Sequence, residues 1–507
     1  MPTTAGSWAR CETFWRDHDP SVSTSLSVTD SAASPPTRPA RRSRGRLPRR
    51  WIRWLLVAAA VLVVSTVVVV ATGMRPDYDG FGWLVWGRQV LHWNLNTDGA
   101  PSWKPLTFVF TLPYALAGTA QLWLWMVTSV AGAVGGCVFA ARIAFRLAGS
   151  SSDRRYAPYV AGAFAGVCLL GIDTYSHLVL IANSDPLIVT LCLGAIDSHL
   201  SRRPRLAFAF LVGASLGRPE AWVFTGLYAL WAWRAVPRSR WLLVAGLLLI
   251  PAFWFTIPAL TSHSWFIAGD LALGQKTVIH GNKILGVISR FRSLYGLPMQ
   301  LAALLGIGLA AARRDRVTLA IAGAGVLWVV IEIAFAYHGW SAVSRYLIEP
   351  AGVMVVIAGG AVGRVLADAR SARLLRWAGP VLVLVLVAAL VPTVRHRADD
   401  TRVALDNAHK HEKQVDRLRA VVDKIGGPDK VKSCGQPVSL LGFQSTLAWV
   451  VGLNVGDIGY RPGKAIGQGE DIVLFKPHEE GWQVRPYNLA ATQKGRCGAL
   501  KTDSSMG

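Results

Sequence analysis

The sequence is short of charged residues and of cysteine. Only 16% of its 507 residues are charged and 52% are hydrophobic, and it holds six cysteines. This composition excludes a disordered chain, a collagen, a coiled coil and a disulfide scaffold, and it is too apolar for a soluble enzyme of this length. No CxxC pair or His/Cys spacing indicates zinc. We also find no clear internal repeat, a feature that many transporters have.

What the chain has instead is a series of apolar runs. The longer ones span about 18–22 residues, the length that an α-helix needs to cross a bilayer. The sequence therefore predicts an all-α polytopic membrane protein with about 11 transmembrane helices. Two of the runs are short, which leaves this number open by one helix pair. The runs are residues 51–73, 120–146, 157–172, 186–200, 206–217, 222–236, 241–260, 296–312, 317–336, 347–364 and 377–394.

Basic residues outnumber acidic ones, 53 to 30, and their placement tells which partner they have. Arginine is dense in residues 1–53, directly before the first apolar run. This is typical of a cytoplasmic flank that anionic lipid headgroups attract, so we expect a lipid bilayer and no nucleic acid as the partner. Residues 1–50 are predicted to be a disordered basic tail because their Ser/Thr/Pro-rich part has little to bury. The run 54–73 is too long for a signal peptide and predicts a retained anchor.

The distribution of arginine also predicts the topology. The short loops on one side of the eleven runs carry more arginine than the longer loops on the other side, which places them in the cytoplasm. The protein is thus expected in the cell (plasma) membrane. An odd number of spans puts its N-terminus on the cytoplasmic side and its C-terminus on the extracytoplasmic side. We expect a transmembrane domain over residues 51–395 and an extracytoplasmic domain over 396–507.

The C-terminal segment has the pattern of a small α+β domain. Apolar residues recur at helical spacing over 415–425, and short strand-like runs follow at 437–443 and 471–475. Cys434 and Cys497 are the two cysteines of this segment. Because an outward-facing segment lies in an oxidising compartment, we predict that they form a disulfide.

Polar groups gather on the predicted outer side, at the ends of the apolar runs. Ionisable residues in or near hydrocarbon are costly and are functional candidates for that reason. A random scatter would divide them between the two faces, so their grouping predicts a site at the outer surface. The groups are Asp77 with Asp79; His177 with Asn183, Ser184 and Asp185; Arg218 with Glu220; and Tyr337 with His338, Arg345 and Tyr346.

The first outer loop, residues 74–119, is the most informative. Its paired aspartates, Asp77 and Asp79, suit a division of labour in which one deprotonates a hydroxyl and the other orients a partner or cation. The alternative is a solvated loop with a helix cap. The loop is also rich in tryptophan, which we expect either to stack on sugars or to form an interfacial aromatic belt. These tryptophans are Trp83, Trp86, Trp93 and Trp103.

Together these features resemble the GT-C glycosyltransferases, membrane enzymes that use polyprenyl-phosphate sugars and include protein O-mannosyltransferases and actinobacterial mannosyl- and arabinosyltransferases. The resemblance covers roughly residues 51–395. The Asp-x-Asp spacing departs from the adjacent acidic pair of several members, which leaves open which aspartate is the base. The motifs that carry the resemblance are Asp77-Tyr78-Asp79, Ser184-Asp185-Pro186, Arg218-Pro219-Glu220 and Ser344-Arg345-Tyr346.

The resemblance implies an inverting hexosyl- or pentosyltransferase. Such an enzyme moves a sugar from a polyprenyl-phosphate donor to a glycan, lipid or protein acceptor of the cell envelope. Asp77 or Asp79 is then the base, and arginine stabilises the leaving phosphate. A divalent cation, Mg²⁺ or Mn²⁺, at these two aspartates stays open. The residues expected to bind the donor phosphate or substrate are Arg218, Glu220, Arg345, Tyr346, Asp185, His177, Lys104, Trp103 and Lys276.

Several of these residues also have local explanations. In these alternatives, Arg218 with Glu220 only fixes a turn, Arg345 only reaches lipid headgroups, and Asp185 only caps the helix that follows it. The fourth outer loop, residues 261–295, is either a lid that orders over bound donor or an amphipathic linker. Two other classes of protein are kept as alternatives. They are a ligase or polymerase of lipid-linked oligosaccharides, and a transporter or flippase of envelope precursors.

Overall fold

The computed structural model describes residues 49–99, 101–149, 155–273, 277–367, 375–478, 481–489 and 497. The chain forms two compact units, Met1–Trp54 and Leu55–Gly507. Residues 1–48, which hold nearly all of the predicted basic tail, lie outside the described residues. Apart from the first residues of helix α2, the described residues all belong to the unit Leu55–Gly507.

All eleven predicted apolar runs lie in helices. The run 241–260 contains Pro251, which lacks the backbone N–H that a regular helix needs, and a π-helical turn follows it directly. The corresponding helices are α2 (Arg49–Thr72), α5 (Gln121–Leu147), α6 (Ala157–Leu169), α8 (Asp185–Leu200), α9 (Pro204–Gly217), α10 (Ala221–Ala235), α11 (Arg240–Pro251) with η3 (Ala252–Thr256) and α12 (Ile257–Thr261), α15 (Leu297–Ala312), α16 (Arg316–His338), α17 (Ile348–Ala367) and α18 (Leu375–Lys424).

The helices differ in length. Within the described part of the chain, six are long and apolar enough to cross a membrane, and α14 (Lys283–Ser293) with α15 forms a seventh candidate that bends by 102°. The helices α6, α8, α9 and α10 have 13, 16, 14 and 15 residues. These are shorter than the roughly 20 residues of a straight crossing. The chain is therefore a polytopic helical membrane protein, as predicted.

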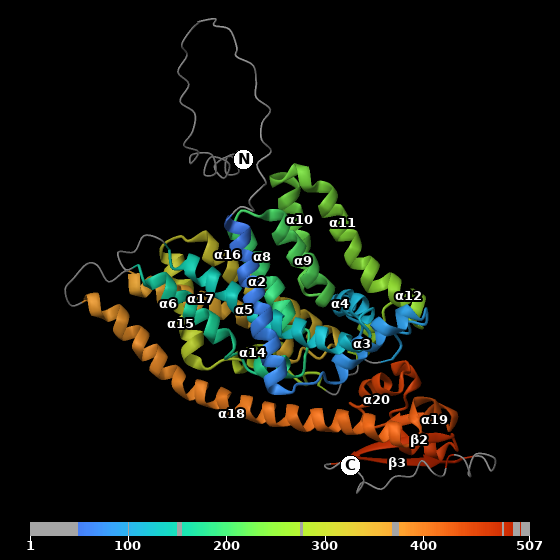
Figure 1. Cartoon of the computed structure of the whole chain (residues 1–507). Helices are drawn as coiled ribbons and strands as arrows, with labels where there is room; N and C mark the ends of the chain where they lie inside the picture. Colours follow the sequence, from blue (N-terminus) through green and yellow to red (C-terminus); the bar gives the residue numbers. More distant parts are fainter. Residues whose placement is uncertain are drawn as a thin grey trace, which may run out of the picture. The chain divides into compact units, whose positions relative to one another are not determined.

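Helix α17 lies at the centre of the packing. Its apolar stretch is 83% buried, against 11% for α2 and α18. It packs against α5, α6, α8, α15 and α16 in one hydrophobic cluster (Figure 1). A Cβ atom on Gly359 would lie 2.8 Å from the Cβ of Ala165 and 3.0 Å from the Cβ of Ala144. Small residues thus let these helices approach closely, as is common in membranes.

The predicted outer loops contain helices of their own. They connect the long helices and carry most of the polar groups singled out above. These elements are α3 (Tyr78–Leu91), α4 (Pro105–Ala115), η1 (Gly118–Ala120), α7 (Tyr175–Leu180), α13 (Ile267–Ala272), α14 and η4 (Ser344–Leu347). A further short element, η2 (Pro237–Ser239), lies in a predicted inner loop.

The positions of the tryptophans in the first outer loop differ from both predicted roles, sugar stacking and an interfacial belt. Trp83, Trp86 and Trp103 are fully buried in one cluster, where the rings of Trp86 and Trp103 lie 5.1 Å apart. Trp103 donates its indole N–H to the carbonyl oxygen of Phe253 at 3.0 Å. Neither sugar stacking nor an interfacial belt fits these three, because their faces pack against protein. Trp93 alone among the four is exposed, at 96%.

The C-terminal segment has the predicted α+β character. A sheet of order β1-β2-β3, in which β1 pairs with β2 in parallel and β2 pairs with β3 antiparallel, packs with short helices. In Figure 1, α18 runs without a break into this part of the chain, so the expected boundary at 395/396 falls inside that helix. The elements are α19 (Gly427–Ser433), β1 (Gln436–Ser439), α20 (Gln444–Val451), η5 (Val455–Asp457), α21 (Pro462–Gly467), β2 (Ile472–His478) and β3 (Gly481–Tyr487).

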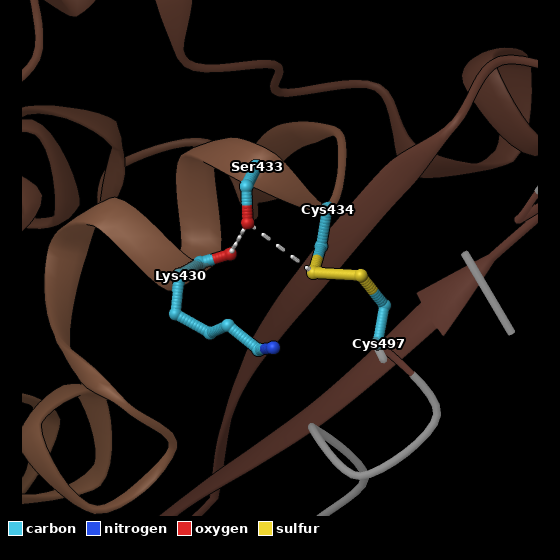
Figure 2. Close-up of a disulfide and its surroundings, with 4 residues drawn as sticks. All are labelled: Lys430, Ser433, Cys434 and Cys497. Carbon is cyan, nitrogen blue, oxygen red and sulfur yellow. Dashed lines mark hydrogen bonds between the residues drawn. A yellow bond between two sulfur atoms is a disulfide. The ribbon is translucent and has the colours of Figure 1, made fainter. Parts of the chain in front are cut away.

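A disulfide joins the ends of this segment. Cys434 and Cys497 are bonded, in agreement with the prediction, and both are fully buried (Figure 2). Beside the bond, the hydroxyl of Ser433 donates to the carbonyl oxygen of Lys430 at 2.9 Å. The bridge closes a loop with a sequence separation of 63.

Removing this bridge is expected to destabilise the C-terminal segment. Because a crosslink of this loop size restricts the unfolded chain, Cys434→Ser with Cys497→Ser should lower the free energy of unfolding by about 2–4 kcal/mol. Limited proteolysis of the full chain checks this, with Cys168→Ser as the control for loss of a thiol elsewhere. Equal protease resistance of the double variant and the Cys168→Ser control would contradict the expectation.

Candidate functional site

The paired aspartates lie at the start of α3. Asp77 is the N-cap of this helix, and its carboxylate accepts from the backbone N–H groups of Asp79, at 3.2 Å, and Gly80, at 3.4 Å. The backbone N–H of Asp77 donates to the carbonyl oxygen of Ile181 at 3.3 Å. The capping interpretation therefore holds for Asp77. It leaves the second oxygen of its carboxylate available for chemistry.

The environment of Asp77 changes its acidity. Burial, followed by the negative charge of the neighbouring Asp79, raises the pKa of Asp77 to about 7. The capping amides and Arg345 act in the opposite direction but do not cancel this effect. A carboxylate with a pKa near neutrality is well matched to accept a proton from a hydroxyl group.

Helix α18 holds the segment that precedes Asp77. Arg75 pairs with Glu412 at 3.0 Å, and a ring nitrogen of His411 lies 2.9 Å from the carbonyl oxygen of Pro76. These contacts join the first outer loop to a helix more than 300 positions away in the sequence. They fix where the chain leaves α2 and turns into α3.

Arginine residues from two other groups reach this position. Arg345 lies 3.5 Å from a carboxylate oxygen of Asp79, so it is paired with protein rather than directed only to headgroups. Arg218 donates to the backbone carbonyl oxygen of Arg345 at 3.2 Å. The guanidinium of Arg218 also lies 4.4 Å from the centre of the Tyr346 ring, a cation–π contact. Three of the predicted groups thus meet in one place.

Asp185 connects the fourth group to the same network. Its carboxylate accepts from Arg218 at 2.7 Å and lies 3.7 Å from the amine of Lys104. Ser184 is the N-cap of α8, and its side chain makes no capping hydrogen bond there. Asp185 is fully buried, so we assign its carboxylate to the arginine network and not to a helix cap.

Arg218 is surrounded by acidic side chains. Within the described residues it contacts Asp185, Glu349 at 3.0 Å and Glu220 at 3.7 Å. The Glu220 contact is the turn arrangement expected from the sequence, yet it is the longest of the three. With 4% of its side chain exposed, Arg218 is fully engaged by protein, whereas 35% of the Arg345 side chain is exposed. Arg345 is the cation that has room to meet a ligand.

Sequence reasoning missed two members of this cluster. Glu349 and Glu332 are buried in α17 and α16, inside runs that were assigned only as membrane spans. A signal was present, because a lone glutamate within an apolar run of membrane length is costly unless it has a partner. Glu349 has such a partner in Arg218.

Some predicted residues do not join this cluster. His177 lines a separate cavity with α14 and α18, and burial lowers its pKa. Trp103 belongs to the tryptophan core, and Lys276 lies outside the described residues. The fourth outer loop contains α13 and α14, and neither the lid nor the linker hypothesis is tested by this arrangement.

A divalent cation fits the two aspartates poorly. In the described part of the chain, no group of three or more His, Cys, Asp or Glu side chains is placed to hold a metal. One oxygen of Asp77 accepts from backbone amides, and Asp79 faces Arg345. The acids thus have protein partners, and we assign no chemical step to a cation.

The similarity of this chain to known proteins is structural and distant. Neither a search with protein-family models nor a search of curated proteins produced a match. Among solved structures, ArnT from Cupriavidus metallidurans is similar, both bound to undecaprenyl phosphate and in the apo state. Each comparison has 13% sequence identity and a TM-score of 0.46, and covers 89% of this chain and 95% of ArnT. A likeness this distant does not assign a function.

Proposed function

We propose that this protein is an inverting glycosyltransferase that transfers a sugar from a polyprenyl-phosphate donor to an acceptor of the cell envelope. The observation that carries the proposal is the network in which Asp79, Arg345, Arg218 and Asp185 meet beside Asp77, with Arg218 and Asp185 buried. A membrane protein keeps such a network at a considerable desolvation cost. The GT-C-like motifs of the sequence supply these same residues.

In this proposal the base is Asp77. The acceptor hydroxyl attacks the anomeric carbon, its proton moves to Asp77, and the bond between that carbon and the phosphate oxygen breaks. The electron pair leaves with the polyprenyl phosphate. Because Asp79 pairs with Arg345 and Asp77 has the raised pKa, the two acids have different tasks. Attack from the face opposite the phosphate inverts the anomeric centre.

The leaving phosphate is assigned to Arg345, and Lys104, which lies 3.7 Å from Asp185, adds a second positive charge to the same network. Permanently charged guanidinium groups stabilise phosphate oxygens with short, directional hydrogen bonds. Arg218 is neutralised by its acidic neighbours, so we give it the task of fixing Arg345 and Tyr346 through the backbone and ring contacts. The sugar is a hexose or a pentose, and the resemblance favours mannose or arabinose.

The proposed location is the plasma membrane, with the site and the C-terminal segment outside the cell. The Cys434–Cys497 disulfide supports this orientation, because such bonds persist in oxidising compartments. Acceptor choice within the envelope, whether glycan, lipid or protein, belongs to this outer face.

A double substitution separates this proposal from transport. Asp77→Asn with Asp79→Asn should abolish sugar transfer by the purified protein in nanodiscs while the protein still inserts into membranes. A transporter or flippase would keep moving intact lipid-linked sugar without forming a new glycosidic bond. Transfer of a preassembled oligosaccharide in place of a single sugar would favour the ligase or polymerase.

Loss of Arg345 should weaken transfer. Since one stabilising donor to a developing anion accounts for about 10²–10³-fold in rate, Arg345→Gln is expected to lower kcat by that factor. Arg345→Lys should restore part of it through charge alone. Arg402→Gln, at an arginine with 79% exposure, is the matched control. Steady-state kinetics with a polyprenyl-phosphate sugar measure the effect, and unchanged kcat in Arg345→Gln would remove Arg345 from the mechanism.

Chelation should leave transfer intact. Because the acidic pair is engaged by backbone amides and Arg345, we expect the rate in EDTA to equal the rate without it. The measurement is transfer after dialysis against EDTA, followed by addition of Mg²⁺ or Mn²⁺. A rate that falls in EDTA and returns with either cation would contradict this expectation.

A further inference from the structure

A second feature of the molecule is a large open cavity beside the candidate active site. It has a volume of about 1090 Å³, opens to the surface and is lined by residues of α7, α14, α15 and α18. Cavities of this size accommodate whole ligands of small-molecule dimensions. Apart from His177, the cavity uses none of the residues assigned above to the chemistry.

The lining of the cavity suits hydroxyl groups better than phosphate. Its two arginines, Arg292 and Arg397, are balanced in number by Asp173 and Asp400, and the lining also holds His177 and His396. Arg397 bridges both aspartates, at 2.5 Å from Asp173 and 3.0 Å from Asp400. Serine, threonine and glutamine side chains add groups that both donate and accept. Sugar hydroxyls need this mixture, whereas a phosphate site needs an excess of positive charge.

The rim of the cavity is apolar and continues along a membrane helix. Leu285 and Leu297 line the cavity and are 65% and 60% exposed. Further along α15, Leu301 and Leu304 are 55% and 61% exposed without lining it. Because α14 and α15 together form a candidate span, this exposed apolar face is suited to contact lipid tails. A ligand with a sugar head in the cavity has a path for a hydrocarbon tail along α15.

Two walls of the cavity are bonded to the candidate active site. Helix α7 ends at Leu180, and the carbonyl oxygen of the next residue, its C-cap Ile181, accepts from the backbone N–H of Asp77. From α14, Arg290 donates to the carbonyl oxygen of Ser341 and, at 2.9 Å, to that of Ala342. Ala342 has a left-handed backbone, with φ of 42°, three residues before Arg345. Two elements of the cavity wall therefore contact the segments that carry Asp77 and Arg345.

We propose that this cavity binds the acceptor, and that the acceptor is a glycolipid whose sugar head enters between α14 and α18 while its tail follows α15. The assignment as acceptor rests on the proposed function. The presence of a glycolipid site does not, since the lining and the apolar rim specify it independently.

Photolabelling of the full chain in phosphatidylcholine nanodiscs tests the site without requiring turnover. The probe is decyl mannoside with a diazirine on its chain. It should label peptides from α14 and α15, and Leu297→Trp should lower this labelling about tenfold by narrowing the cavity. Leu248→Trp is the matched control, because it places the same bulk on a similarly exposed leucine of α11, which neither lines the cavity nor lies on α15. It should label as the wild type does.

Other outcomes would overturn the proposal. Equal labelling of Leu297→Trp and wild type, or equal labelling by a diazirine decanol without sugar, would reduce the cavity to ordinary lipid contact. Unlabelled methyl mannoside and decyl mannoside can also be added as competitors of the probe. Equal reduction of labelling by the two would assign the cavity to a soluble glycan in place of a glycolipid. Labelling as expected in a protein that moves no sugar would keep the site and reject the glycosyltransferase. Sugar transfer by a protein that is not labelled in this way would keep the glycosyltransferase and reject the glycolipid site.

Discussion

Replacing Asp77 with asparagine is expected to lower kcat for sugar transfer by about 10²–10⁴-fold, the range that general bases contribute. Asparagine is as good an N-cap as aspartate, so α3 should keep its start and the protein its fold. What is lost is the group that accepts the proton. An effect of this size without a change in thermal stability identifies chemistry rather than structure.

The pH profile adds a second signature of the same residue. The base must be ionised, and the pKa of Asp77 is about 7, so the wild-type rate should rise with pH up to about 7 and then level off. In Asp77→Asn this rise should vanish from the residual rate. If the rise persists there, or if Asp79→Asn and not Asp77→Asn removes it, Asp79 is the base.

Replacing Arg218 with methionine is expected to lower the free energy of unfolding by about 3–5 kcal/mol, because it leaves buried carboxylates without their counter-charge. Asp185 and Glu349 are both buried and both lie within 3.0 Å of the guanidinium. Methionine fills similar space, so the loss is electrostatic. Activity should also fall, since Arg345 and Tyr346 lose a neighbour that positions them.

The control is an arginine whose ion pair is exposed. Arg402 pairs with Asp399 at 3.1 Å, with 79% and 67% of the two side chains exposed, and such pairs contribute less than about 1 kcal/mol. Arg402→Met should therefore melt close to wild type in detergent, while Arg218→Met melts well below it. Similar melting temperatures for the two variants would contradict a buried network centred on Arg218.

The sequence predicted the helices well because hydrophobic runs are a local property. Members of all four predicted groups also meet in one network, although His177 lines a separate cavity. What the sequence did not predict is tertiary burial. Trp83 and Trp103 have the same local signature whether they face lipid, sugar or protein. Their burial depends on tertiary contacts, of Trp83 with Trp125 of α5 and of Trp103 with Phe108 of α4. In the same way, Glu349 lies in an apolar run, and its role depends on Arg218 reaching it from another helix.

The sequence marked two short runs, which became α9 and α10, but it did not single out α6 and α8 as too short to cross alone. The helices α6, α8 and α9 are apolar and each has proline in its first turn, and polar site residues stand at an end of α8 and of α9. Asp185 and Arg218 stand at such ends, at the start of α8 and just after α9. The same residues that interrupt the helices therefore build the network.

The most direct measurement offers the purified wild-type protein, in nanodiscs, one radiolabelled sugar in two forms. One is linked to polyprenyl phosphate and the other to a nucleotide, and a cell-envelope extract supplies the acceptor. The account predicts transfer from the lipid-linked form, with inversion at the anomeric carbon, and none from the nucleotide form. Transfer from the nucleotide form, or no transfer from the lipid-linked form, would contradict it.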